Sequence, residues 1–167
     1  MGMHVVVMGV AGCGKSEVGR RLADSLHLPL VEGDAFHPPA NVDKMRSGVP
    51  LTDADRAGWL DRLARELAAH PDGAVLTCSA LKRSYRDRLR TAGPLVRFVH
   101  LALPLAEAQR RVAARPGHFY PPTLVASQFQ ALEDPAGEPG VVVVDARLPL
   151  AEVVTRACRG LAAFNNP

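Results

Sequence analysis

The chain has 167 residues, of which 47% are hydrophobic and 22% are charged, and these proportions exclude an intrinsically disordered chain. The net charge of +3 is spread along the sequence without a basic tract, and only 5% of residues are aromatic, which argues against nucleic-acid binding. There is no signal-peptide pattern and no membrane-length apolar stretch, and the three cysteines form no C-x-x-C pair. We therefore expect a cytoplasmic protein with neither a disulfide framework nor a zinc site.

Apolar, β-rich runs alternate with helical patterns along the chain, which predicts an α/β fold with a parallel sheet. The expected strands are residues 4–9, 28–32, 74–78, 96–102 and 141–145. Helical patterns begin near residues 15, 41, 53, 81, 105, 123 and 149. Thr52 precedes a pattern with acidic residues in its first turn, so we expect it to be a helix N-cap. No repeat or composition change divides the chain, which predicts one domain over residues 1–167.

The segment "GVAGCGKS", residues 9–16, matches G-x-x-x-x-G-K-[ST] and stands between an expected strand and an expected helix. Backbone N–H groups of such a loop surround phosphate oxygens, and the helix N-terminus adds its dipole. We expect Lys15 to contact the β- and γ-phosphates and Ser16 to ligate Mg²⁺. A dinucleotide fingerprint is the competing interpretation, but its G-x-G-x-x-G register is absent.

The other motifs expected of large phosphate-loop classes are missing. A GTPase would need the base-reading N-K-x-D, which the chain lacks, and "DRAG" (55–58) lies inside a helical pattern. A large ATPase would need an acid at the end of a hydrophobic strand, yet "AVLTC" runs into "SALKR". Asp145 ends the last strand, and in small phosphate-loop kinases that strand leads to the adenine-binding side of the site. These observations favour a small kinase.

The segment "VEGDAFHPP", residues 31–39, places two carboxylates at the end of the second strand, beside the phosphate loop. Glu32 and Asp34 are two apart, so on an extended chain they point the same way. One can hold a magnesium-bound water, and the other can take the proton of an attacking hydroxyl. We expect the prolines that follow to fix the turn that aims His37 at the substrate.

A candidate lid lies in "RRVAARPGHFYPP", residues 110–122, where a helix end with several arginines precedes a Gly/Pro/aromatic loop. Such a segment suits a lid that closes over ATP and brings cations to the transferring phosphate. For Arg110 the alternative is a solvated helix face.

Together these segments resemble the small bacterial-type gluconokinases, relatives of shikimate kinase among the nucleoside-monophosphate-kinase-like proteins. The phosphate loop is generic, whereas "GDAFHPPANVDKM", "CSALKRSYRD" and "GHFYPP" are specific to gluconokinases. The resemblance implies ATP-dependent phosphorylation of D-gluconate at its terminal hydroxyl, giving 6-phospho-D-gluconate and ADP. It also implies a three-layer fold with a five-stranded parallel sheet flanked by helices, a helical lid near residues 112–130, and a homodimer.

The resemblance also implies roles for individual residues. Lys15, Asp34 and Arg115 would be catalytic, with Asp34 as the base, and Glu32, where many relatives have Asp, would support Mg²⁺ through water together with Ser16. The residues implied at the nucleotide are Gly9, Val10, Ala11, Gly12, Cys13, Gly14, Lys15, Ser16, Glu17, Arg111, Arg115 and Pro149. The residues implied around the sugar acid are Asp34, His37, Lys44, Lys82, Arg83 and His118.

Two alternatives stay open on the residues alone. The chain could be a kinase for another small sugar acid or polyol, because pocket shape and not motif decides chain length and stereochemistry. It could also be a nucleotide-binding protein that has lost transfer, although intact Lys15, Asp34, His37 and Arg115 argue against that.

Overall fold

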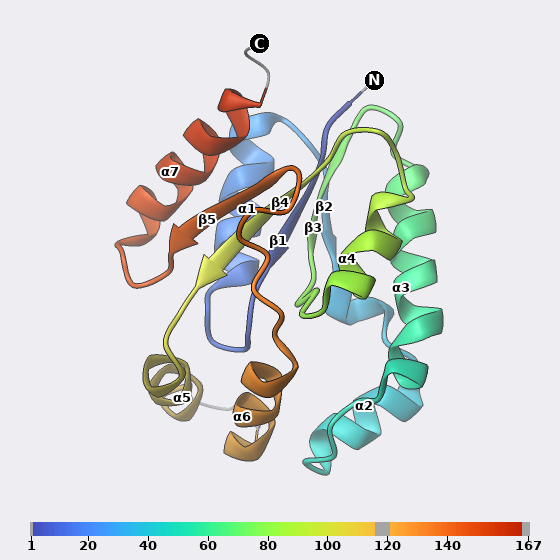
Figure 1. The fold of residues 1–167 in the computed structure, drawn as a ribbon, viewed down its shortest axis with the longest axis vertical. Coiled ribbons are helices and arrows are strands. Elements are labelled where there is room, and N and C mark those ends of the chain that lie inside the picture. The colour runs from blue at the N-terminus through green and yellow to red at the C-terminus, as the bar shows by residue number, and fades with distance from the viewer. Residues whose placement is uncertain (1, 116–120, 165–167) are drawn as a thin grey trace.

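The sheet has five parallel strands in the order β2-β3-β1-β4-β5 in the computed structural model, which describes residues 2–115 and 121–164 (Figure 1). The strands are β1 (His4–Met8), β2 (Leu30–Glu32), β3 (Ala74–Thr77), β4 (Val96–Ala102) and β5 (Val141–Asp145). The predicted five-stranded parallel sheet is thereby confirmed, and β5 lies at the edge opposite β2.

Helices cover both faces of this sheet, which gives three layers. The helices are α1 (Lys15–Leu26), α2 (Pro39–Arg46), α3 (Asp53–Ala68), α4 (Arg83–Arg90), α5 (Leu105–Ala113), α6 (Pro122–Ala131) and α7 (Leu150–Ala163). Side chains of the central strand alternate between the two layers: Val5 and Val7 pack with residues of α1 and α7, whereas Val6 and Met8 pack with residues of α3 and α4. In the described ranges, no helix is both long and apolar enough to cross a membrane.

The helices α2, α5 and α6 gather beyond the carboxyl ends of the strands, at the lower end of Figure 1. Thr52 caps α3 as predicted: its hydroxyl accepts from Asp55 N–H, and the Asp55 carboxylate accepts from Thr52 N–H. This capping box fixes where α3 begins.

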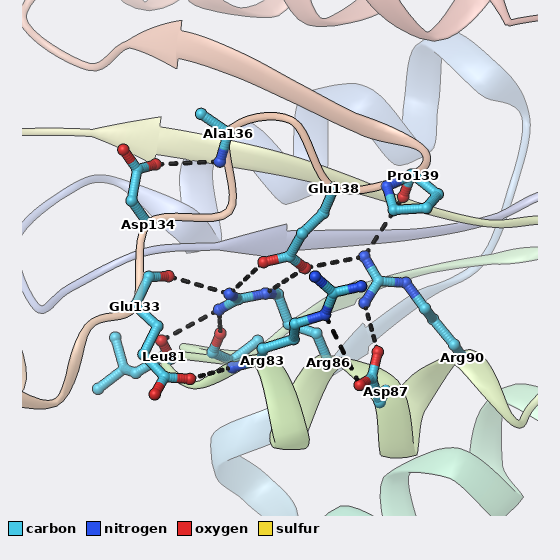
Figure 2. Close-up of polar contacts among 11 residues, drawn as sticks. Leu81, Arg83, Arg86, Asp87, Arg90, Glu133, Asp134, Ala136, Glu138 and Pro139 are labelled. Carbon is cyan, nitrogen blue, oxygen red and sulfur yellow. Dashed lines mark hydrogen bonds and ion pairs between the residues drawn. The ribbon is translucent and has the colours of Figure 1, made fainter.

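A buried arginine ties α4 to the segment that connects α6 with β5 (Figure 2). The side chain of Arg86 is fully buried and forms a two-pronged ion pair with Glu138, at 2.9 and 2.6 Å. Its remaining N–H groups donate to the carbonyls of Ala80, Leu81 and Glu133 at 2.8–3.0 Å. A buried guanidinium is tolerated when every donor has a partner, and here each does. Arg86 thus holds the turn between β3 and α4, in which Ala80 has a left-handed φ of 47°.

Candidate active site

The phosphate loop connects β1 to α1, as the motif requires. Gly14, at the N-cap of α1, has a φ of +93°, a conformation that residues with a Cβ rarely adopt. Lys15 Nζ donates to the carbonyls of Gly9 at 3.1 Å and Val10 at 3.2 Å. These bonds fold the ammonium group back over the loop.

The two carboxylates at the end of β2 and just after it, Glu32 and Asp34, have different surroundings. Glu32 Oε2 accepts from Thr77 Oγ1 at 2.5 Å and from Ser16 Oγ at 3.3 Å. Asp34, by contrast, has 84% of its side chain exposed. The expectation that the chain from Glu32 to Asp34 is extended, so that both side chains point the same way, is wrong, because the short 3-10 helix η1 (Gly33–Phe36) begins directly after β2.

Tight packing against β3 explains why the chain turns here. A Cβ at Gly33 would lie 2.2 Å from the Thr77 carbonyl oxygen, so only glycine fits there. The Trp59 indole donates from Nε1 to the Gly33 carbonyl at 2.9 Å. Gly33 is therefore held between β3 and α3, and the chain turns Asp34 away from Glu32.

The imidazole of His37 lies flat on the indole of Trp59, with ring centroids 4.0 Å apart and an interplanar angle of 16°. Its side chain is 4% exposed, and its Nε2 is 3.9 Å from Asp34 Oδ1. Burial lowers the pKa of His37, the Asp34 carboxylate opposes that shift, and the Arg56 guanidinium adds to it. His37 is thus neutral at neutral pH.

On the opposite side of the loop, α5 and α6 contact the loop backbone. Gln128 Oε1 of α6 accepts from Ala11 N–H at 2.6 Å. Arg111 of α5 donates to Gly12 O at 3.4 Å and to Ala146 O at 2.9 Å, which joins the loop to the turn before α7. Pro149 is the N-cap residue of α7 at the end of that turn. Arg111 and Pro149 therefore lie on the side of the loop where the sequence predicted adenine.

One cavity joins these parts. From the loop it is lined by Ala11, Gly12, Gly14, Lys15 and Ser16, and from the other elements by Asp34, His37, Met45, Leu51, Arg56, Trp59, Ser79, Val112, Arg115 and Gln128. A phosphate-binding loop, an exposed carboxylate and two cations of separate elements thus face one space. Such an arrangement can hold a phosphoryl donor and a polar acceptor side by side.

Comparison with known proteins shows the family. The family model described as an AAA domain matches residues 5–139. The chain is 50% identical to the gluconokinase of Gluconobacter oxydans over 144 residues, which cover 84% of this chain and 80% of that protein. The chain belongs to the gluconokinase family.

Solved structures agree with that membership. The crystal structure of a gluconokinase from Sinorhizobium meliloti superposes with a TM-score of 0.91 at 47% identity, covering 97% of this chain and 93% of that one. Shikimate kinase from Aquifex aeolicus has a TM-score of 0.65 at 17% identity, covering 98% of each chain, and this likeness shows the fold alone. The resemblance to gluconokinases and the shikimate-kinase-like fold predicted from the motifs are both confirmed.

Arg56 lines the cavity, although no sequence motif assigned it to the site. Its Nη1 donates to Leu51 O at 2.6 Å and to the Tyr85 hydroxyl at 3.4 Å, and its guanidinium lies 5.5 Å from the centre of the Tyr85 ring. These contacts hold a permanent positive charge at the cavity wall. The sequence spacing could have indicated this position, because Arg56 precedes Trp59 by three residues and therefore lies on the same face of the helix.

The predicted substrate cations are distributed unevenly. Lys44 pairs with Asp55 at 2.8 Å, and this hydrogen bond is the main reason that the pKa of Asp55 falls to about 2. Lys82 pairs with Asp53 at 3.0 Å and lines a second, adjacent groove that Arg56 also lines. Arg83 lines neither cavity. His118 lies outside the described residues.

The remaining predicted nucleotide residues lie in or next to the loop. Gly9, Val10 and Cys13 are buried, and Glu17 is exposed on α1, where it pairs with Arg20 at 2.8 Å. None of these four lines the cavity. Gly9 N–H donates to Ser79 O and Cys13 N–H donates to Val10 O, both at 3.3 Å.

Proposed function

We propose that the chain transfers the γ-phosphoryl group of ATP to the terminal hydroxyl of D-gluconate, giving 6-phospho-D-gluconate and ADP. The observation that carries this proposal is the single cavity that unites the phosphate loop with Asp34, His37 and Arg56. Curated relatives named gluconokinase support it, including the Gluconobacter oxydans protein.

In the proposed mechanism Asp34 is the base. As the hydroxyl oxygen attacks the γ-phosphorus, its proton passes to the Asp34 carboxylate while the bond from phosphorus to the ADP oxygen breaks. The exposure of Asp34 to the cavity supports this role, since a base must reach the acceptor hydroxyl. Lys15 and Arg115 neutralise charge on the transferring group.

We assign Mg²⁺ to Ser16 and, through water, to Glu32. A hydroxyl and a carboxylate oxygen 3.3 Å apart are hard oxygen donors of the kind that Mg²⁺ prefers, so the residues present fit the ion. The Thr77 hydroxyl donates to the Glu32 carboxylate and thereby orients it. Within the described part of the chain, no group of three or more His, Cys, Asp and Glu side chains could hold a metal. Phosphates and water would therefore complete the shell, and the bound ion would neutralise phosphate charge.

Gluconate needs cations for its carboxylate and mixed donors and acceptors for its hydroxyl groups. Arg56 and His37 line the cavity, and Lys82 lies in the groove beside it. Lys44 and Lys82 are engaged with aspartates, but an ammonium has three donors and can make further bonds. Arg83 and His118 complete the set that the resemblance implies.

We further propose one domain over residues 1–167, a lid over residues 112–130, a homodimer and a cytoplasmic location. Arg115 and Gln128 line the cavity from that lid segment, which supports closure there. Cys13, Cys78 and Cys158 are free thiols, which is the usual state of cysteines in a reducing compartment. Sedimentation velocity tests the dimer directly.

The decisive experiment is an ADP-release assay with Mg-ATP and a panel of acceptors: gluconate, other aldonic acids, glucose, shikimate and nucleoside monophosphates. We expect turnover on gluconate, with the other acceptors far weaker. A higher kcat/KM on another aldonic acid would favour the alternative sugar-acid kinase. Nucleotide binding with no turnover on any acceptor would favour a protein that has lost transfer.

A further inference from the structure

Asn41, in the first turn of α2, is the residue that contacts the inner side of His37. It is 3% exposed. Its Nδ2 lies 3.0 Å from the Asp55 carbonyl oxygen and 3.2 Å from His37 Nδ1. One amide nitrogen thus joins the start of α3 to the imidazole in the cavity.

The Asp55 carbonyl decides which way the amide faces. A carbonyl oxygen can only accept a hydrogen bond, so the group 3.0 Å from it must be the NH₂ of Asn41 and not its oxygen. One N–H is used there, and the other points at His37 Nδ1. That ring nitrogen must accept, so it carries no proton, and the proton of a neutral ring is on Nε2.

The other groups around the ring agree with a neutral imidazole. A doubly protonated ring would set an N–H of His37 against an N–H of Asn41. The surrounding charges are Arg56 from α3, which disfavours a cation, and Asp34 from η1, which favours one. Trp59 covers one ring face and keeps water from it. Asp34 Oδ1 is 3.9 Å from Nε2, too far for a hydrogen bond, so the Nε2–H is directed at the cavity.

We propose that Asn41 is a positioning residue that holds His37 as the neutral Nε2–H tautomer, so that His37 gives the acceptor substrate a hydrogen-bond donor and never a base. The identity of that substrate rests on the proposed function. A fixed donor at this point selects an acceptor oxygen, either a hydroxyl or a carboxylate oxygen of the sugar acid. It also leaves Asp34 to receive the hydroxyl proton.

The first test is ¹⁵N NMR of the imidazole nitrogens in the wild-type protein labelled at histidine, with the His37 signals assigned by their loss in His37→Gln. We expect an unprotonated, pyridine-like Nδ1 and a protonated Nε2 at neutral pH. A protonated Nδ1, in either the other tautomer or the imidazolium, overturns the proposal. This measurement needs no variant of Asn41 and no turnover.

The second test is Asn41→Leu, which keeps similar volume and removes both N–H groups. We expect the Nδ1 and Nε2 signals to move toward a mixture of tautomers. We also expect the KM for gluconate to rise about 2- to 12-fold, the loss of one hydrogen bond, with the KM for ATP unchanged. Leu67→Ala, in the buried end of α3, is the stability control: it lowers the free energy of unfolding and leaves the His37 signals in place. If Asn41→Leu raises KM while the ring signals stay unchanged, Asn41 is only structural and the proposal fails.

The third test separates a donor from a base at position 37. Gln can place an amide N–H near the position of ring Nε2, so His37→Gln should keep a gluconate KM closer to wild type than His37→Leu does. Equal losses in both variants contradict a donor role. If wild-type protein turns over no sugar acid, the proposed function fails while the ring signals still decide the tautomer. If gluconate is turned over and Nδ1 is protonated, only this inference fails.

Discussion

The phosphate loop and the acceptor side of the cavity are built in different ways. The loop is one run of residues, 9–16, whose backbone and Lys15 we propose bind the phosphates. The acceptor side is assembled from side chains of separate elements: Asp34 from η1, His37 from the turn after it, and Arg56 from α3. A site made from one segment depends on local conformation, whereas an assembled site depends on packing. Substitutions should therefore affect the two sides differently.

The largest effect should come from Asp34→Asn. An amide of the same shape cannot take the hydroxyl proton, so we expect kcat to fall about 10²- to 10⁴-fold. Nucleotide affinity should change little, because Asp34 is not part of the loop. Steady-state kinetics and nucleotide titration measure the two quantities. Asp72→Asn, an exposed aspartate in the turn before β3, is the matched control, and a fully active Asp34→Asn enzyme would refute the base.

Lys15→Ala tests the loop side of the comparison. Removing one fixed cation from the transferring phosphate should lower kcat about 10²- to 10³-fold. Because the glycines set the loop conformation, the variant should keep the wild-type thermal midpoint and its KM for gluconate. Rapid-quench measurement of the transfer step reads the effect directly. Unchanged kcat would contradict the role of the loop.

Arg56→Gln tests the acceptor side. We expect Arg56, a cation of the cavity wall, to pair with the sugar-acid carboxylate. Its loss should therefore raise the KM for gluconate about 10- to 100-fold, with the KM for ATP unchanged. Arg88→Gln is the control, since Arg88 forms an exposed ion pair with Asp61 at 2.9 Å and does not line the cavity. Equal changes in the KM for gluconate and the KM for ATP would show that Arg56 does not act on the acceptor side alone.

The smallest effect concerns pH. Because the pKa of His37 is lowered below 6.5, the unfolded chain binds more protons than the folded chain below that value. The contribution of His37 to stability is therefore complete above pH 6.5 and is lost as the pH falls through the folded pKa. Urea unfolding from pH 8 to pH 5 should show a steeper decline for wild type than for His37→Gln. Parallel curves would mean that His37 does not titrate differently on folding.

Local patterns predicted much of the molecule. The strands, the phosphate loop and the Thr52 N-cap follow from hydrophobic period, glycine spacing and capping chemistry, which act over a few residues. The 3-10 turn that begins directly after Glu32 could not be predicted in this way. It results from the contact of Gly33 with the Thr77 carbonyl, 44 positions along the chain.

The sequence by itself determined the kind of chemistry, because the phosphate loop and the acid after β2 lie in short segments whose residue types specify it. Tertiary structure decided which side chains share the cavity and in what state. Lys44 turns to Asp55, Arg56 reaches the cavity wall, and the amide of Asn41 meets His37. These outcomes depend on distances between elements that no local pattern encodes, and burial among those elements lowers the pKa of His37.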